Sequence, residues 1–169
     1  MVPGLKRLGR VAVALAVVAA LAAAGAGWTL AGEDAEPAAK RIPLAKANNV
    51  RGAPDRSLEL SRVVIPAGVK LDRHLHEGTQ IAYIDKGKLR YTVHTGSVKV
   101  RDGSPGDATA VRKIKAGETG TLKPGNWIVE QPSTQHSAAN RGNKKVVVFV
   151  ANLLKSDAPP ATPTGQHPR

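Results

Sequence analysis

Apolar and polar residues alternate in short runs through the middle of the chain, and glycine-containing turns separate these runs. Alternation with a period of two is typical of strands that bury one face, and several such runs in succession indicate a sandwich or a barrel. Because no amphipathic helix or internal repeat interrupts them, the pattern predicts one all-β domain, a jelly roll or β-barrel, at residues 57–154. The predicted strands are residues 57–65, 80–85, 88–94, 97–101, 119–122, 127–130, 136–140 and 144–154.

Residues 102–117, with the sequence DGSPGDATAVRKIKAG, are the longest interruption of this pattern. Gly, Pro and Asp are among the residues that most often form turns and loops. We therefore expect a surface loop between the two halves of the barrel, with Val111 and Ile114 as its anchoring contact.

The chain starts with a basic segment that is followed by an apolar one. Lys6, Arg7 and Arg10 precede a run of Ala, Val, Leu and Gly that ends in small residues. This order predicts that residues 1–31 are a secretory signal. Because the apolar stretch approaches the roughly 20 residues that span a bilayer, an uncleaved membrane anchor is the alternative. In either case we expect an exported protein, either secreted or anchored on the extracytoplasmic face of the membrane.

Two further segments flank the predicted domain. Residues 32–56 are rich in Ala, Glu, Lys, Asn and Pro without a sustained period, which predicts a linker or an N-terminal arm that lies on the barrel. Residues 155–169 are rich in proline and contain almost nothing to bury, which predicts a disordered tail.

Composition narrows the chemistry that is available to this chain. Cysteine is absent, which excludes a cysteine nucleophile, a thiolate metal site and thiol redox chemistry. The net charge of +12 is spread along the chain rather than clustered, and only five aromatic residues are available to stack on bases. We therefore expect a solvated cationic surface and no nucleic-acid partner.

Three histidines and a glutamine form the candidate metal site. His74 and His76 are two residues apart, so in a strand both side chains would project from the same face. A turn after His76 would place Gln80 beside them, and His136 opens a later strand. Neutral imidazoles and an amide oxygen suit one divalent transition-metal ion, with Fe, Mn, Ni, Cu and Zn as the candidates.

The spacing of these residues resembles the two sequence motifs of the cupin family. The first motif is a Gly, five residues, His-any-His, three or four residues, Glu, six residues and Gly. This chain has Gly68, His74, His76, Gln80 and Gly87 at these spacings, with Gln80 in place of the family's metal-binding Glu.

The second motif is a Gly, five residues, Pro-any-Gly, two residues, His, three residues and Asn. This chain matches it at Gly125, His136 and Asn140. It departs from the motif at Gln131, where the family has Pro, and at Ser133, where the family has Gly. The other histidines, His94 and His167, match neither motif and are interpreted as surface or hydrogen-bonded residues.

The resemblance implies a single-domain cupin β-barrel (a double-stranded β-helix, or jelly roll) with one metal ion held by His74, His76, Gln80 and His136. The chain looks most like small exported single-domain cupins of actinobacterial type. Because the Gln80 amide is neutral, four neutral ligands would leave the full charge of the ion inside the barrel, so we expect the site to recruit an anion. Alternatively, Gln80 hydrogen-bonds a metal-bound water and is not itself a ligand.

Three functions are compatible with this site. Four ligands on an ion that accepts six leave two positions open, which suits a dioxygenase-like oxidoreductase acting on a small, chelating, anionic substrate. The second hypothesis is a metal-dependent isomerase, lyase or hydrolase that does not use dioxygen. The third is a non-catalytic module that binds a metal or a small ligand. No catalytic residue is assigned, because Glu130, the candidate for proton transfer, is equally compatible with an outward-facing position.

Three aromatic residues, Tyr83, Tyr91 and Trp127, are candidates for the mouth of the pocket, although large apolar residues on strands more often serve packing. An exposed strand edge would favour a homodimer.

Overall fold

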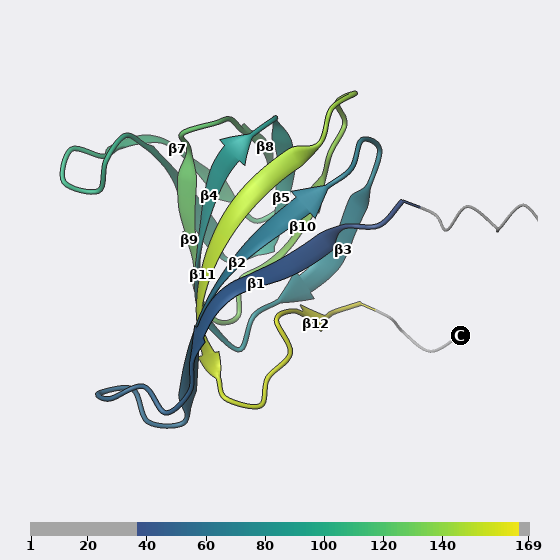
Figure 1. The fold of residues 1–169 in the computed structure, drawn as a ribbon. Coiled ribbons are helices and arrows are strands. Elements are labelled where there is room, and N and C mark those ends of the chain that lie inside the picture. Colours follow the sequence, from purple (N-terminus) through teal and green to yellow (C-terminus); the bar gives the residue numbers. More distant parts are fainter. Residues whose placement is uncertain (1–36, 166–169) are drawn as a thin grey trace, which may run out of the picture. The chain divides into compact units, whose positions relative to one another are not determined.

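The computed structural model describes residues 37–165, and the regular structure in this range is made of β-strands (Figure 1). The strands pair in antiparallel fashion and form two sheets, which confirms the predicted all-β jelly-roll class. They are β1 (Lys40–Ala47), β2 (Arg56–Ile65), β3 (Lys70–Leu75), β4 (Gly78–Lys86), β5 (Leu89–Thr95), β6 (Ser97–Asp102), β7 (Thr109–Lys115), β8 (Thr119–Leu122), β9 (Trp127–Glu130), β10 (Gln135–Ala139), β11 (Val146–Lys155) and β12 (Thr162–Pro163).

The larger sheet has seven strands in the order β1-β2-β11-β4-β9-β6-β7, and the smaller sheet has five in the order β12-β3-β10-β5-β8. Most neighbours in both sheets are far apart in the sequence, so each sheet combines strands from both halves of the chain. Alternate residues of each strand face the space between the sheets. Buried side chains such as Ile84, Val93 and Ile128 form one hydrophobic core there.

The segment that was expected to be a loop, residues 102–117, contains the edge strand β7, which pairs with β6. Ile114 is the one buried residue of this strand, whereas Val111 is 56% exposed. The loop prediction is therefore wrong for residues 109–115. An edge strand that buries a single side chain has almost no apolar alternation by which a sequence pattern could reveal it.

Both flanking segments add a strand to the domain. β1 lies in the predicted arm and pairs with β2, and β12 lies in the predicted tail and pairs with β3. The structure differs here from the prediction of disorder, because residues 156–165 pack on the domain through backbone hydrogen bonds, which composition does not reveal. One of them joins the Thr164 N–H to the Arg73 carbonyl at 2.9 Å.

The predicted signal or anchor, residues 1–31, lies outside the residues that the structure describes. Within residues 37–165, no helix is long and apolar enough to cross a membrane.

Two residues of the second motif fix the chain on either side of β10. Asn140 is fully buried, and its side-chain amide donates hydrogen bonds to the carbonyls of Ile65 and Lys144 at 2.9 and 2.8 Å. Ser133 has a φ of 72°, a left-handed conformation in which a Cβ atom crowds the neighbouring carbonyl. The motif therefore has glycine at this position for a conformational reason, and Ser133 adopts the glycine conformation at an energetic cost.

We predict that Ser133→Gly raises the free energy of unfolding by about 0.5–1 kcal/mol, because glycine adopts a positive φ without strain. Chemical denaturation would measure the change. Ser97→Gly, on the exposed side of β6, is the control and should lower the free energy of unfolding by a similar amount. A Ser133→Gly variant that is as destabilised as the control would show that this turn is not strained.

Candidate metal centre

The three predicted histidines come together at one end of the smaller sheet. His74 on β3 faces His136 on β10, and His76 follows β3 at the turn into β4. The centroids of their imidazole rings lie 4.3 to 5.2 Å apart. One nitrogen of each ring lies within 4.8 Å of the others, so these residues could hold one metal ion.

Each of these imidazoles uses its Nδ1 atom for a hydrogen bond to a backbone carbonyl. His74 donates to the Asp72 carbonyl and His76 to the Pro160 carbonyl, both at 2.6 Å. His136 donates to the Thr134 carbonyl at 3.3 Å. A carbonyl oxygen can only accept, so Nδ1 carries the proton in all three rings. In a neutral imidazole the other nitrogen, Nε2, then presents a lone pair. Metal-binding histidines are commonly oriented in this way.

Burial favours the neutral form of two of these rings, those of His74 and His136. It lowers the pKa of His136 to about 4, despite the opposing effect of the Glu130 carboxylate. Burial also lowers the pKa of His74. Both side chains are therefore uncharged imidazoles at neutral pH and able to bind a metal without losing a proton.

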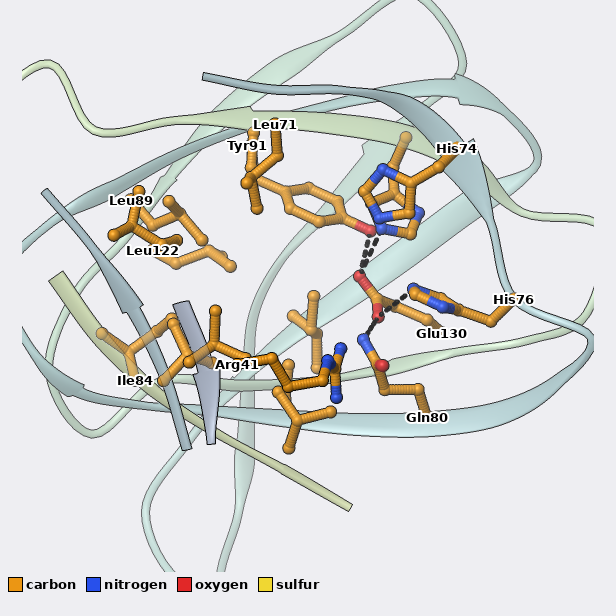
Figure 2. Close-up of a pocket in the computed structure, with 18 residues that line it drawn as sticks. Arg41, Leu71, His74, His76, Gln80, Ile84, Leu89, Tyr91, Leu122 and Glu130 are labelled. Atoms are coloured by element: carbon orange, nitrogen blue, oxygen red, sulfur yellow. Dashed lines mark hydrogen bonds and ion pairs between the residues drawn. The ribbon is translucent and has the colours of Figure 1, made fainter. Parts of the chain in front are cut away.

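Glu130 lies at the centre of this site. It is 2% exposed and faces Gln80 across the pairing of β9 with β4. Its Oε1 atom lies 3.1 Å from Nε2 of His136. Its Oε2 atom lies 3.5 Å from Nε2 of His76, which Figure 2 shows beside Glu130. The structure therefore places inside the cavity a carboxylate for which the sequence allowed either an inward or an outward position. Residues two apart in a strand share a face, so Glu130 must lie on the same face of β9 as Ile128. This could have predicted its inward position, but β9 has apolar residues on both faces, so the sequence does not show which face is buried.

Two donors hold the Glu130 carboxylate in its ionised form. The Tyr91 hydroxyl donates to Oε1 at 2.7 Å, and the Gln80 amide nitrogen donates to Oε2. Burial raises the pKa of Glu130, whereas the hydrogen bond from Tyr91, and positive charge on His136 or His76 when these rings are protonated, lower it. The pKa of Tyr91 is raised by burial and by Glu130, so its phenol stays protonated and continues to donate.

These groups fit a metal ion. Nε2 of His76 and Oε1 of Gln80 are buried and have no hydrogen-bond partner in the described part of the chain. Ligand atoms bound at about 2.1 Å to one ion lie about 3.0–3.4 Å from their neighbours, close to the two distances between Glu130 and the histidines. The Nε2 lone pairs of His76 and His136 lie against the oxygens of the Glu130 carboxylate. A cation placed among these atoms would bind both the nitrogens and the oxygens.

Gln80 lies where the sequence predicted, beside the histidines. Its amide nitrogen is engaged by Glu130, and its oxygen is the buried atom without a partner. That oxygen is free to bind a metal or a metal-bound water, so ligation by Gln80 stays a prediction.

The metal centre lies in a small cavity of about 70 Å³. Apolar side chains, among them Leu89 and Leu122, line the part that lies away from the histidines, and Arg41 enters from β1 (Figure 2). Of the three aromatic candidates only Tyr91 lines this cavity, whereas Tyr83 is 43% exposed on the outer face of β4.

The remaining histidine candidates lie elsewhere. His94 hydrogen-bonds Ser137 at 2.9 Å beside a different hollow, and His167 is outside the described residues.

Solved structures that are similar to this one include the following three proteins. A cupin 2 domain-containing protein from Halorhodospira halophila has 15% identity and a TM-score of 0.50, over 80% of this chain and 77% of that chain. The polyketide cyclase RemF from Streptomyces resistomycificus has 15% identity and a TM-score of 0.51, over 77% and 73% of the two chains. The DMSP lyase DddQ from Ruegeria pomeroyi has 18% identity and a TM-score of 0.50, over 89% and 68%.

At such identities the similarity shows the fold alone, and the described residues have the fold of a single-domain cupin. No family model matches the sequence, and no curated protein is similar to it in sequence.

The C-terminal segment contributes to the candidate metal centre, because the Pro160 carbonyl orients His76. We predict that deleting residues 157–169 lowers metal affinity about 10- to 100-fold, as is typical when a group that orients a metal ligand is lost. Competition with a chromophoric chelator would measure the affinity. Deleting residues 166–169 keeps Pro160 and β12 and should leave the affinity unchanged. Equal affinities for both deletions and the full chain would show that the segment does not orient His76.

Proposed function

We propose that this protein is an exported cupin that binds one divalent transition-metal ion. The proposed ligands are His74, His76, His136 and the Glu130 carboxylate, with the Gln80 amide oxygen as a further candidate. The observation that supports the proposal is the convergence of acceptor atoms. Three imidazole nitrogens and the Glu130 carboxylate meet in one buried site, and the ring protons of the histidines are used by backbone carbonyls.

In this proposal Glu130 supplies the charge that the family places at the position of Gln80. The two residues face each other on adjacent strands. The carboxylate of this chain is therefore one strand away from the position of the family's Glu, but it lies in the same site. The sequence alone suggested four neutral ligands and an uncompensated ion. With Glu130 present, one of the two charges of the ion is neutralised within the protein, which lowers the cost of burying it.

The chemistry proposed for this centre is dioxygenase-like oxidation of a small, chelating, anionic substrate. Histidines with one carboxylate and open positions are a donor set that suits redox-active metals such as Fe and Mn, and such a metal would supply Lewis acidity and dioxygen activation. The chain's own residues position this chemistry. Tyr91 and Gln80 hold the carboxylate in place, and the apolar walls exclude bulk water and restrict the substrate to a small molecule.

A non-catalytic metal- or ligand-binding module is the second candidate. Both oxygens of Glu130 already accept hydrogen bonds, from Tyr91 and from Gln80, which makes this carboxylate a poor proton acceptor. Among the described residues that line the cavity, no other carboxylate is present. An isomerase or lyase, which needs a proton acceptor beside the metal, is therefore less well supported than the other two functions.

Elemental analysis of residues 32–169, purified without a histidine tag, tests the metal site. We predict one equivalent of a transition metal in this protein and less than about one tenth of an equivalent in His136→Ala, which removes a central ligand. His94→Ala removes a histidine outside the cavity and should keep the metal. If His136→Ala retains a full equivalent, the proposed site is wrong.

The same preparation separates the two candidate functions. The dioxygenase-like function predicts that the metal-loaded protein consumes dioxygen with at least one small chelating anion, and that His136→Ala does not. A binding module would be stabilised by such anions without consuming dioxygen or converting them.

The role of Glu130 can be tested by removing its carboxylate and then by placing a carboxylate at position 80 on the neighbouring strand instead. Glu130→Gln should weaken metal binding by at least about tenfold, because the buried ion loses the one carboxylate among the described residues that line the cavity. The double variant Gln80→Glu/Glu130→Gln restores one carboxylate to the pair and should recover most of the affinity in a chelator-competition assay. A Glu130→Gln variant that binds metal as tightly as the original protein would contradict this role.

A further inference from the structure

Arg41 places a positive charge inside the metal cavity. It lies on β1, opposite Val63 of β2, and its side chain points into the cavity (Figure 2). Its Nη1 atom is buried and has no hydrogen-bond partner among the described residues. Within residues 37–165, no carboxylate oxygen lies within 4.0 Å of the guanidinium.

Arg41 is half-buried, and its buried Nη1 atom without a partner is unfavourable unless an anion or another acceptor joins it. Glu59 and Glu130 are the carboxylates whose charges act on Arg41, yet neither forms an ion pair with it. Glu130 is already hydrogen-bonded by Tyr91 and Gln80. With a divalent ion bound, Glu130 and Arg41 together would leave a cavity of net positive charge. The site is then complete only when an anionic ligand enters.

A second hollow, of about 400 Å³, adjoins the metal cavity between β1, β3 and β12. Arg41 and His74 line both spaces, so a ligand that moves from this hollow to the metal passes Arg41. Lys70 and Arg73 also line the hollow, against a single acid, Asp72. This excess of positive charge would attract anions to the entrance.

We propose that Arg41 binds a carboxylate group of the ligand, while the remainder of the ligand reaches the metal. This inference rests on the proposed function and adds a specificity residue to it. A guanidinium is planar and can form two parallel hydrogen bonds with the two oxygens of a carboxylate. The small cavity favours a compact planar group. The preferred ligands are therefore short-chain acids with a second metal-binding group a few bonds from the carboxylate.

Malonate, a three-carbon dicarboxylate, is a suitable probe, and its neutral diamide, malonamide, is the control ligand. Calorimetric titration of the metal-loaded protein would compare the original chain with Arg41→Gln, Arg41→Lys and Lys40→Gln. Lys40 is exposed on the same strand, so Lys40→Gln removes the same charge from outside the cavity. Physiological salt, at which the Debye length is about 8 Å, limits the general effect of surface charge.

The expected result is that Arg41→Gln weakens malonate binding about 10- to 100-fold and leaves metal affinity within about threefold of the original. The malonate affinity of Arg41→Lys should lie between those of the original chain and Arg41→Gln, because lysine keeps the positive charge but cannot form two parallel hydrogen bonds with one carboxylate. Lys40→Gln should bind malonate as the original chain does, and malonamide should bind all four proteins equally weakly. In thermal unfolding, malonate should stabilise the original chain and not Arg41→Gln.

Equal malonate affinity in Arg41→Gln and Lys40→Gln, or no binding of malonate by the metal-loaded original chain, would overturn the role of Arg41. The metal content of each sample separates this failure from a failure of the proposed function. If the protein holds no metal but malonate still stabilises it in an Arg41-dependent manner, the carboxylate site stands and the metal-dependent function falls. If metal is bound and Arg41 has no effect, only the present inference falls.

Discussion

The buried carboxylate of Glu130 lies against the Nε2 atoms of His76 and His136, and this arrangement constrains the whole centre. The Nδ1 proton of each histidine is used by a backbone carbonyl, so the rings cannot offer the carboxylate a proton without becoming charged. Burial opposes that charge, as the lowered pKa of His136 shows. A cation shared by these atoms would resolve the conflict. Tyr91 and Gln80 hold the carboxylate in place by hydrogen bonds and leave its negative charge available to such a cation.

Strand pairing brings these groups together from distant parts of the chain. The pairing of β3 with β10 sets His74 against His136, and the pairing of β4 with β9 sets Gln80 against Glu130. Both terminal segments complete the site, because Arg41 comes from β1 and the acceptor for His76 comes from residue Pro160 before β12. The paired strands of the two sheets thus position the histidines, whereas the two terminal segments complete the cavity around them.

The all-β class and the histidine cluster could be predicted from the sequence, because alternation and spacing are local signals. His74 and His76 share a face by strand parity, and the motif resemblance related them to His136. Glu130 could not be assigned, because both faces of β9 carry apolar residues and only the tertiary pairing with Gln80 decides its direction. The sequence did not reveal the roles of Arg41 and Pro160, because both lie in terminal segments without a clear alternation of apolar and polar residues. Backbone pairing rather than apolar burial attaches these segments to the domain. Ligation by Gln80, export and the reaction itself stay predictions.

The most direct measurement of the central claim is a crystal structure of the metal-loaded protein at a resolution that defines each ligand atom, with anomalous scattering to identify the ion. The account predicts one ion bound by Nε2 of His74, His76 and His136 and by a carboxylate oxygen of Glu130, with the three Nδ1 atoms still bonded to their carbonyls. An ion bound elsewhere, or a fully loaded site in which Glu130 has turned away from the ion, would contradict it.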